Sequence, residues 1–322
     1  MGSMVGLILQ SLIFMSIGVW HLCSLFSSYV KSPRDYSARA WYPVSCGSWL
    51  PSRLKHSELY MMLLFIPLAI FYELGISTHF QPLLVDGGAI PGSSILGFEH
   101  VTTLFMFWLF ALLVLLNETT IALPLPTESS FLFASLAFTL EWMSINHETV
   151  ENAGLEKQCK SLLAFIVAIC TFSSGMLVMR PKAFLVDMVL CMGLILQGTW
   201  RFQMALSLFV EGFIPLGCRS MQEDLTRRVS AGYGTRLSST LCDIQEARIR
   251  AIDLMNLAFN CHIIVVVLFS MIALVIIAKV QGYRRINNSN GYDMTLTSDV
   301  DSESKQLKSL SNMTKLSFGR LH

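Results

Sequence analysis

Residues 184–215 read FLVDMVLCMGLILQGTWRFQMALSLFVEGFIP, a long apolar stretch with a polar centre at residues 197–203. A stretch of this length and composition predicts a membrane-spanning helix. Polar side chains are costly against lipid, so Gln197, Arg201 and Gln203 are expected to face other helices or water. The remaining apolar segments are therefore interpreted as helices packed around this one.

The composition indicates a membrane protein. The chain has 322 residues, of which 53% are hydrophobic and 14% are charged, whereas soluble domains carry about 25% charged residues. A net charge of +1 gives no basis for nucleic-acid binding. The eight cysteines show no zinc-type spacing. Those in apolar segments are interpreted as packing residues: Cys23, Cys170, Cys191 and Cys261.

The sequence predicts an all-α fold, a seven-span transmembrane helical bundle over residues 1–283 with a disordered C-terminal tail. The first span is expected to be retained rather than cleaved as a signal peptide. Residues 284–322 are rich in Ser, Asn and charge, so they are predicted to be a disordered cytosolic tail. Residues 240–253 are predicted to be helical and to run into the last span. The predicted spans are 4–26, 57–76, 97–116, 129–145, 161–179, 184–215 and 254–279.

The distribution of basic residues predicts the orientation. With the N-terminus outside, the inner side receives 14 of the 23 Lys and Arg residues, the outer side receives 8, and Arg201 lies in the membrane. Basic residues favour the cytosolic side of a membrane protein. The sequence therefore predicts an integral, multi-pass protein with its N-terminus out and its C-terminus in, located in an endomembrane or the plasma membrane.

The stretch Ile195–Trp200, followed by Gln203 and Leu208–Phe209, resembles the sixth span of the transmembrane protein 45 family. Plant relatives of that family are named viral-response proteins, and the family's proteins are multi-pass with a domain of unknown function. The resemblance covers about residues 4 to 280. It also rests on Gly18, Trp20, Glu99–His100, Glu141, His147, Leu155–Leu163 and His262.

The chain departs from the family's pattern at several positions. Arg201 stands where an aromatic residue is usual, and Val5–Ile8 contains no Gly-His pair. Gln158–Lys160 replaces a His-rich stretch. If the histidines of the family bind a metal, this chain lacks several of the possible ligands.

A polar cluster is expected in the outer half of the bundle, because the predicted topology brings its members to similar depths. Gln197 and Arg201 share one helix face, being four residues apart. Arg201 requires an acidic partner or a water-filled cavity, and Glu141 is the expected partner, with Glu73 as the fallback. The predicted cluster consists of Glu73, His100, Glu141, Gln197, Arg201, Gln203 and His262.

Two interpretations of this cluster remain open at the level of sequence. It is either a polar pocket, including a proton or metal site, or a set of structural ties between helices. His147–Glu151 begins like a zinc-protease motif but ends in Glu and is expected in a loop, so it does not indicate a protease. No base is identified for Thr199 or Ser207 as a nucleophile. Catalytic residues and a cofactor are therefore not assigned.

The preferred functional hypothesis is a non-enzymatic multi-pass membrane protein that acts in membrane interactions or in a stress or viral response. Its expected partners are the lipid bilayer and other membrane or cytosolic proteins, and nucleic acid is not expected. The alternative is a transporter or channel that uses the outer-half polar cluster. A membrane-embedded metal enzyme is the least favoured of the three.

Overall fold

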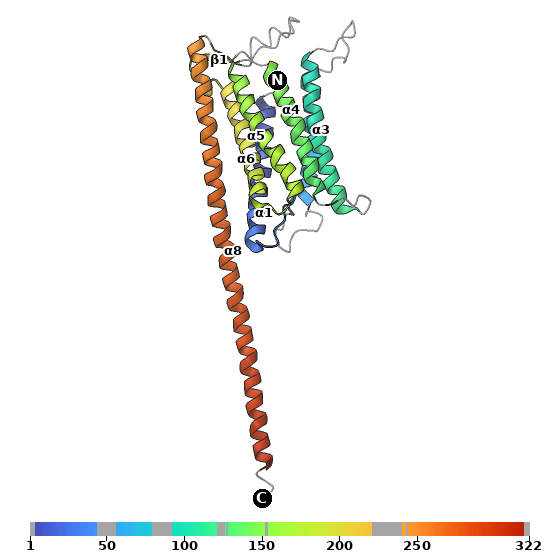
Figure 1. Cartoon of the computed structure of the whole chain (residues 1–322), viewed down its shortest axis with the longest axis vertical. Helices are drawn as coiled ribbons and strands as arrows, with labels where there is room; N and C mark the ends of the chain where they lie inside the picture. The colour runs from blue at the N-terminus through green and yellow to red at the C-terminus, as the bar shows by residue number, and fades with distance from the viewer. Residues whose placement is uncertain are drawn as a thin grey trace.

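The computed structural model shows an antiparallel bundle of long helices, from which the last helix projects well beyond the others (Figure 1). The start of α1 and the short strand β1 lie at one end of the bundle, and the C-terminus lies far beyond the other end. The structure describes residues 4–43, 56–78, 92–120, 126, 128–151, 154–220, 240–242 and 244–318.

Long α-helices account for almost all of the described chain. A short 3-10 helix, η3 (Glu211–Phe213), follows the sixth helix, and two short strands, β1 (Cys218–Ser220) and β2 (Thr240–Cys242), precede the last helix. The α-helices are α1 (Met4–Lys31), α2 (Ser57–Thr78), α3 (Gly92–Thr119), α4 (Ser129–Glu151), α5 (Gly154–Met179), α6 (Phe184–Phe209) and α8 (Gln245–Phe318).

Within the described ranges, six helices are long and apolar enough to cross a membrane: α1, α2, α3, α5, α6 and α8. The chain is therefore a helical membrane protein. The helix α4, expected as the fourth span, is not among the six, since its sequence is more polar. It nevertheless packs between α3 and α5 inside the bundle.

The helix α6, which contains the apolar stretch that begins at Phe184, lies at the centre of the bundle and packs against α1 and α5. Two glycines bring α1 and α6 into close contact. A Cβ atom added at Gly198 would lie 2.7 Å from the backbone nitrogen of Met15, and one at Gly18 would lie 2.8 Å from that of Ile195. Small residues of this kind let helix backbones approach closely in membranes.

The turn Arg180–Lys182 joins α5 and α6. Ala183 N–H donates to the Arg180 carbonyl, and the two helices pack as antiparallel neighbours. The sixth helix ends earlier than expected, at Phe209, because Val210 adopts an extended conformation (φ −104°, ψ 113°). The predicted extension to Pro215 is therefore wrong, since Gly212 and Pro215 are poor helix formers.

The connection between α6 and α8 contains a feature that the sequence analysis missed. Strands β1 and β2 pair antiparallel, and a disulfide joins Cys218 to Cys242 across the pair. The predicted helix over residues 240–253 is therefore wrong at its start, because α8 begins only at Gln245. Cross-strand pairing of Thr240 and Cys242 prevents those residues from joining the helix.

The C-terminal segment continues the last helix. The backbone of α8 is helical as far as Phe318, and the disordered cytosolic tail expected over residues 284–322 stays a prediction. Extending an existing helix adds one hydrogen bond per residue without a new nucleation step, so the apolar part of α8 favours continuation. The boundary of the membrane domain at residue 283 stays a prediction.

Candidate functional site

Arg201 and Glu141 form the ion pair that the sequence predicts inside the bundle. Nη2 of Arg201 donates to Oε1 of Glu141, and the two side chains are 7% and 8% exposed. The same carboxylate oxygen accepts a hydrogen bond from Gln197 Nε2 at 2.6 Å. Arg201 Nη1 also donates to Gln10 Oε1 at 2.9 Å, and its guanidinium lies 5.2 Å from the ring centre of Phe14. The pair therefore connects α6 to α4 and α1.

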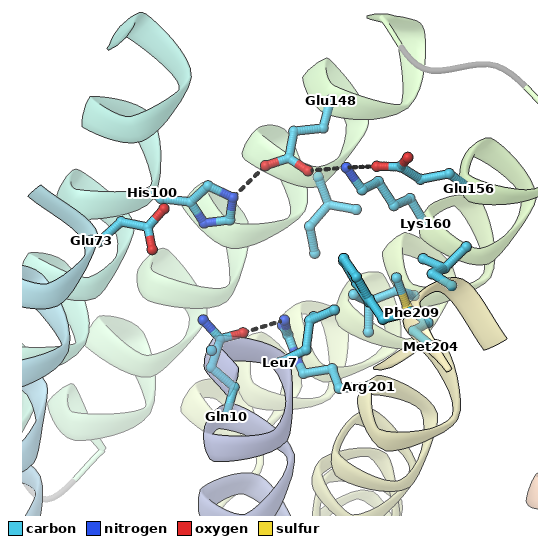
Figure 2. Close-up of a pocket in the computed structure, with 14 residues that line it drawn as sticks. Leu7, Gln10, Glu73, His100, Glu148, Glu156, Lys160, Arg201, Met204 and Phe209 are labelled. Atoms are coloured by element: carbon cyan, nitrogen blue, oxygen red, sulfur yellow. Dashed lines mark hydrogen bonds and ion pairs between the residues drawn. The ribbon is translucent and has the colours of Figure 1, made fainter. Parts of the chain in front are cut away.

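A second group of ionisable side chains lies nearer the helix ends, as Figure 2 shows. His100 on α3 contacts Glu148 Oε1 on α4. Lys160 Nζ lies between two carboxylates, 2.6 Å from Glu148 Oε2 and 2.9 Å from Glu156 Oε1. Ionisable groups from α3, α4 and α5 thus form one continuous chain of contacts.

These two groups face a common pocket. Its volume is about 60 Å³, and its polar lining includes Gln10, Glu73, His100, Lys160 and Arg201. Figure 2 shows these side chains extending toward the same space from different helices. The site built by these residues together with Glu141, Gln197, Glu148 and Glu156 is called the outer polar pocket below, where "outer" denotes the end of the bundle at which α1 begins and "inner" the opposite end.

Three polar atoms beside the pocket are buried and lack a hydrogen-bond partner among the described residues: Arg201 Nε, Glu141 Oε2 and Gln197 Oε1. Buried polar atoms without protein partners are commonly satisfied by water, and one water requires at least about 10–15 Å³ of such volume. A pocket of about 60 Å³ has room for several. The geometry therefore suits a small pocket that takes up water.

A further histidine–glutamate pair joins α3 and α4 next to the His100–Glu148 contact. His147 Nδ1 lies 2.9 Å from Glu99 Oε2, one residue before each partner of the His100–Glu148 contact. His147 belongs to α4, so the expectation that His147–Glu151 forms a loop is wrong. The polar end of α4 stays helical because it packs these side chains against α3. Among the described residues, no group of three or more His, Cys, Asp or Glu side chains could hold a metal ion.

The structure brings together five of the seven residues in the predicted cluster. Glu73, His100 and Arg201 line the pocket, while Glu141 and Gln197 bond to Arg201 or to each other. Two others lie elsewhere. Gln203 Nε2 donates to Ser207 Oγ on its own helix at 2.9 Å, and the His262 ring stacks edge-on against Trp200 at 5.8 Å.

Four members of the pocket were not predicted from the sequence. Gln10 is a single polar residue within the apolar helix α1, which was predicted only as a membrane span. Glu148 follows His147, and both were expected in a loop but belong to α4. Glu156 and Lys160 are four residues apart at the start of α5, a spacing that places them on one helix face. That spacing was the one available signal for this pair.

A separate polar group lies at the other end of the bundle and is called the inner polar group. His21 Nε2 lies 2.5 Å from Glu58 Oε1, and Glu58 Oε2 accepts a bond from the Tyr42 backbone at 3.3 Å. Tyr36 donates its hydroxyl to Asp187 Oδ2 at 2.5 Å. Burial, together with the Asp187 charge, raises the pKa of Tyr36, which keeps the hydroxyl protonated as a donor.

The fold and these sites define a multi-pass helical membrane protein with ionisable side chains inside its bundle. A family model described as a family of unknown function (DUF716) matches residues 127–275. The matched part runs from the start of α4 into the apolar part of α8, and it includes Glu141, Glu148, Lys160 and Arg201. No curated protein matches the chain.

Proposed function

We propose that the chain is a seven-span membrane transport protein, not an enzyme, whose outer polar pocket admits a small cation, the proton included. The observation that carries this proposal is the convergence of charged side chains on a pocket with room for water. Chains of Glu and His inside membrane bundles are typical of ion and proton pathways. Structural ties alone would not require space between the helices.

The charge balance of the pocket supports a cationic solute. Four carboxylates, those of Glu73, Glu141, Glu148 and Glu156, face the two permanent cations Lys160 and Arg201. The carboxylates outnumber the cations, and they would still do so if His100 were counted as a third cation. A cleft lined by one sign of charge attracts counter-ions of the opposite sign.

The proposed orientation places the N-terminus and the outer polar pocket on the exoplasmic side. Besides the basic asymmetry, the Cys218–Cys242 disulfide supports it, since disulfides persist in oxidising compartments and are rare in the cytosol. The disulfide precedes α8, so an exoplasmic disulfide places the end of α8 in the cytosol if α8 crosses the membrane once. The location in an endomembrane or the plasma membrane belongs to this proposal.

Thiol accessibility at Met204 tests the proposal. Met204 lines the pocket about 8 Å below the end of α6. We expect the Met204→Cys variant to react in intact cells with the membrane-impermeant cation trimethylammonium-ethyl methanethiosulfonate. Reaction with the anionic sulfonatoethyl analogue is expected to be slower, because the surplus carboxylates repel it.

The matched control is Phe202→Cys on the same helix, a position that is 42% exposed on the bundle surface. A cysteine there would face lipid and stay unreactive toward both reagents, and the unsubstituted chain measures the background from Cys261. Equal, background-level reaction of both variants would show that water does not reach the pocket and would contradict the proposal.

A membrane interaction protein is the second candidate, and α8 favours it. This helix extends far past the rest of the bundle (Figure 1), which presents its backbone to partners outside the membrane core. The resemblance to the transmembrane protein 45 and plant viral-response proteins supports the same candidate, with a role in stress or viral response. Two results together would favour the interaction protein. A partner would be captured only when residues 284–318 are present, and labelling of the Met204→Cys variant would leave the behaviour of the cells unchanged.

A further inference from the structure

A second cavity of about 180 Å³ runs through the bundle between α1 and α2 and reaches α3, α4 and α6. Along α1 its lining extends from Gly6 to His21, which corresponds to about 22 Å of helix at 1.5 Å per residue. A volume of this size drawn out over that length is a narrow passage rather than a round chamber. An engineered cavity of about 150 Å³ accommodates benzene, so this passage has room for a short segment of hydrocarbon.

The wall of the passage is apolar along its middle. Ile17, Ile66, Phe107, Phe138 and Leu194 line this part, with contributions from five helices. Polar groups line only its ends. An apolar cavity of this length loses packing contacts when empty, so a hydrocarbon chain would stabilise it.

The passage communicates with the lipid-facing surface of the bundle. Leu9 and Ile13 of α1 line it and are 47% and 37% exposed, while Phe65 and Tyr72 of α2 line it and are each 42% exposed. The main packing of α1 is against α6 and that of α2 is against α3. A molecule in the bilayer therefore has a lateral route between α1 and α2.

The two ends of the passage differ in their polar groups, and only the inner end carries an arginine. The outer end carries Gln10 and Glu73, which it shares with the outer polar pocket. The inner end carries Arg39, which is exposed in the segment after α1, beside Glu58 and Asp187. Glu58 and Asp187 are already bonded to His21 and Tyr36. Arg39 is thus the group placed to meet an anionic head, and Arg binds phosphate well.

We propose that this passage holds part of one acyl chain of a phospholipid, whose phosphate lies at Arg39 and whose chain enters between α1 and α2, where the rest of it stays in the bilayer. The lipid comes from the leaflet next to the connection between these helices. A sterol carries no phosphate to meet Arg39, and a free phosphate would not use the apolar wall of the passage. This proposal is independent of the transport function proposed for the outer polar pocket.

Native mass spectrometry of the purified full chain, titrated with dioleoyl-phosphatidylglycerol, tests the proposal. We expect one tightly bound lipid on the native chain. Ala69→Phe places a ring into the passage from α2 and is expected to weaken binding by about tenfold or more. The matched control is Ala168→Phe, the same substitution at a surface depression of α5 that lies away from the passage. This variant is expected to bind the lipid with the same affinity as the native chain.

A second variant keeps the test decisive if Ala69→Phe fails to fold. Arg39 is exposed, so Arg39→Gln leaves the packing intact, and we expect it to weaken binding by about three- to tenfold. Glycerol 3-phosphate, which has the head chemistry without a chain, is expected not to displace the lipid. Equal affinity of the native chain and a folded Ala69→Phe, unchanged affinity of Arg39→Gln, or displacement by glycerol 3-phosphate would overturn the proposal.

Discussion

Of the contacts that Arg201 makes, the ion pair with Glu141 could be predicted from the sequence and the hydrogen bond to Gln10 could not. A guanidinium in the middle of a span needs a carboxylate or water, and depth along the helices identified Glu141 as the partner. The hydrogen bond that Arg201 donates to Gln10 was not predictable in the same way, because an isolated Gln in an apolar helix has many possible neighbours. The same is true of the Lys160 contact with Glu148, which depends on how α4 and α5 are rotated against each other.

The Arg201–Glu141 pair should couple energetically. We expect Glu141→Gln to lower the free energy of unfolding in detergent by about 3–5 kcal/mol, because it leaves a buried cation without its counter-charge. Adding Arg201→Phe should recover much of this loss, since no unpaired charge then remains. Reversible unfolding of the two single variants and the double variant measures the coupling.

Gln203 provides the control for that cycle, because it bonds to Ser207 and lies outside the pocket. Combining Gln203→Leu with Glu141→Gln should give additive effects. Additivity within about 0.5 kcal/mol for Arg201→Phe with Glu141→Gln would mean that the pair is not coupled.

At the scale of helices and strands, long apolar runs were sufficient to predict where the helices occur. Their ends were less predictable, because contacts between helices decide them. The polar residues after Ile145 stay helical through Glu151 because His147 and Glu148 contact α3. The Cys218–Cys242 disulfide was missed because cysteine spacing alone does not specify pairing between distant positions.

The close contact of α1 and α6 predicts a steric effect at Gly198. A methyl group there would lie 2.8 Å from the Ser11 carbonyl oxygen and 2.7 Å from the Met15 nitrogen, so the two backbones must separate. We expect Gly198→Ala to lower the free energy of unfolding by about 1–3 kcal/mol. Gly212→Ala, where a Cβ meets nothing within 4 Å, should change it by less than about 0.5 kcal/mol. Equal stability of the two variants would contradict the packing.

The disulfide between β1 and β2 predicts a specific pattern of thiol labelling. Thiols of the denatured chain are tagged with a polyethylene-glycol maleimide, with and without prior reduction. For the unsubstituted protein, reduction should add the two tags of Cys218 and Cys242. The double variant Cys218→Ser/Cys242→Ser should gain two fewer tags on reduction. An unchanged gain in the double variant would show that these two cysteines are not bonded.

At the scale of the whole molecule, the number of spans decides the orientation of every site. Six helices are apolar enough to cross a membrane among the residues described, and α4 is the proposed seventh. If α4 crosses, the termini lie on opposite sides and the outer polar pocket lies on the side of the N-terminus. If it does not, both termini lie on one side. The sequence could not decide whether α4 crosses the membrane. Its apolar run is barely long enough for a span, and its polar residues make contacts inside the bundle.

Protease protection of terminal tags in sealed vesicles tests this account most directly. A tag before Met4 and a second tag after His322 are followed in microsomes whose cytosolic face is outward, and detergent-opened vesicles show that both tags can be cleaved. The account predicts cleavage of the C-terminal tag and protection of the N-terminal tag, together with a protected Cys218–Cys242 disulfide. Cleavage of both tags, or protection of both, in sealed vesicles would contradict the seven-span arrangement.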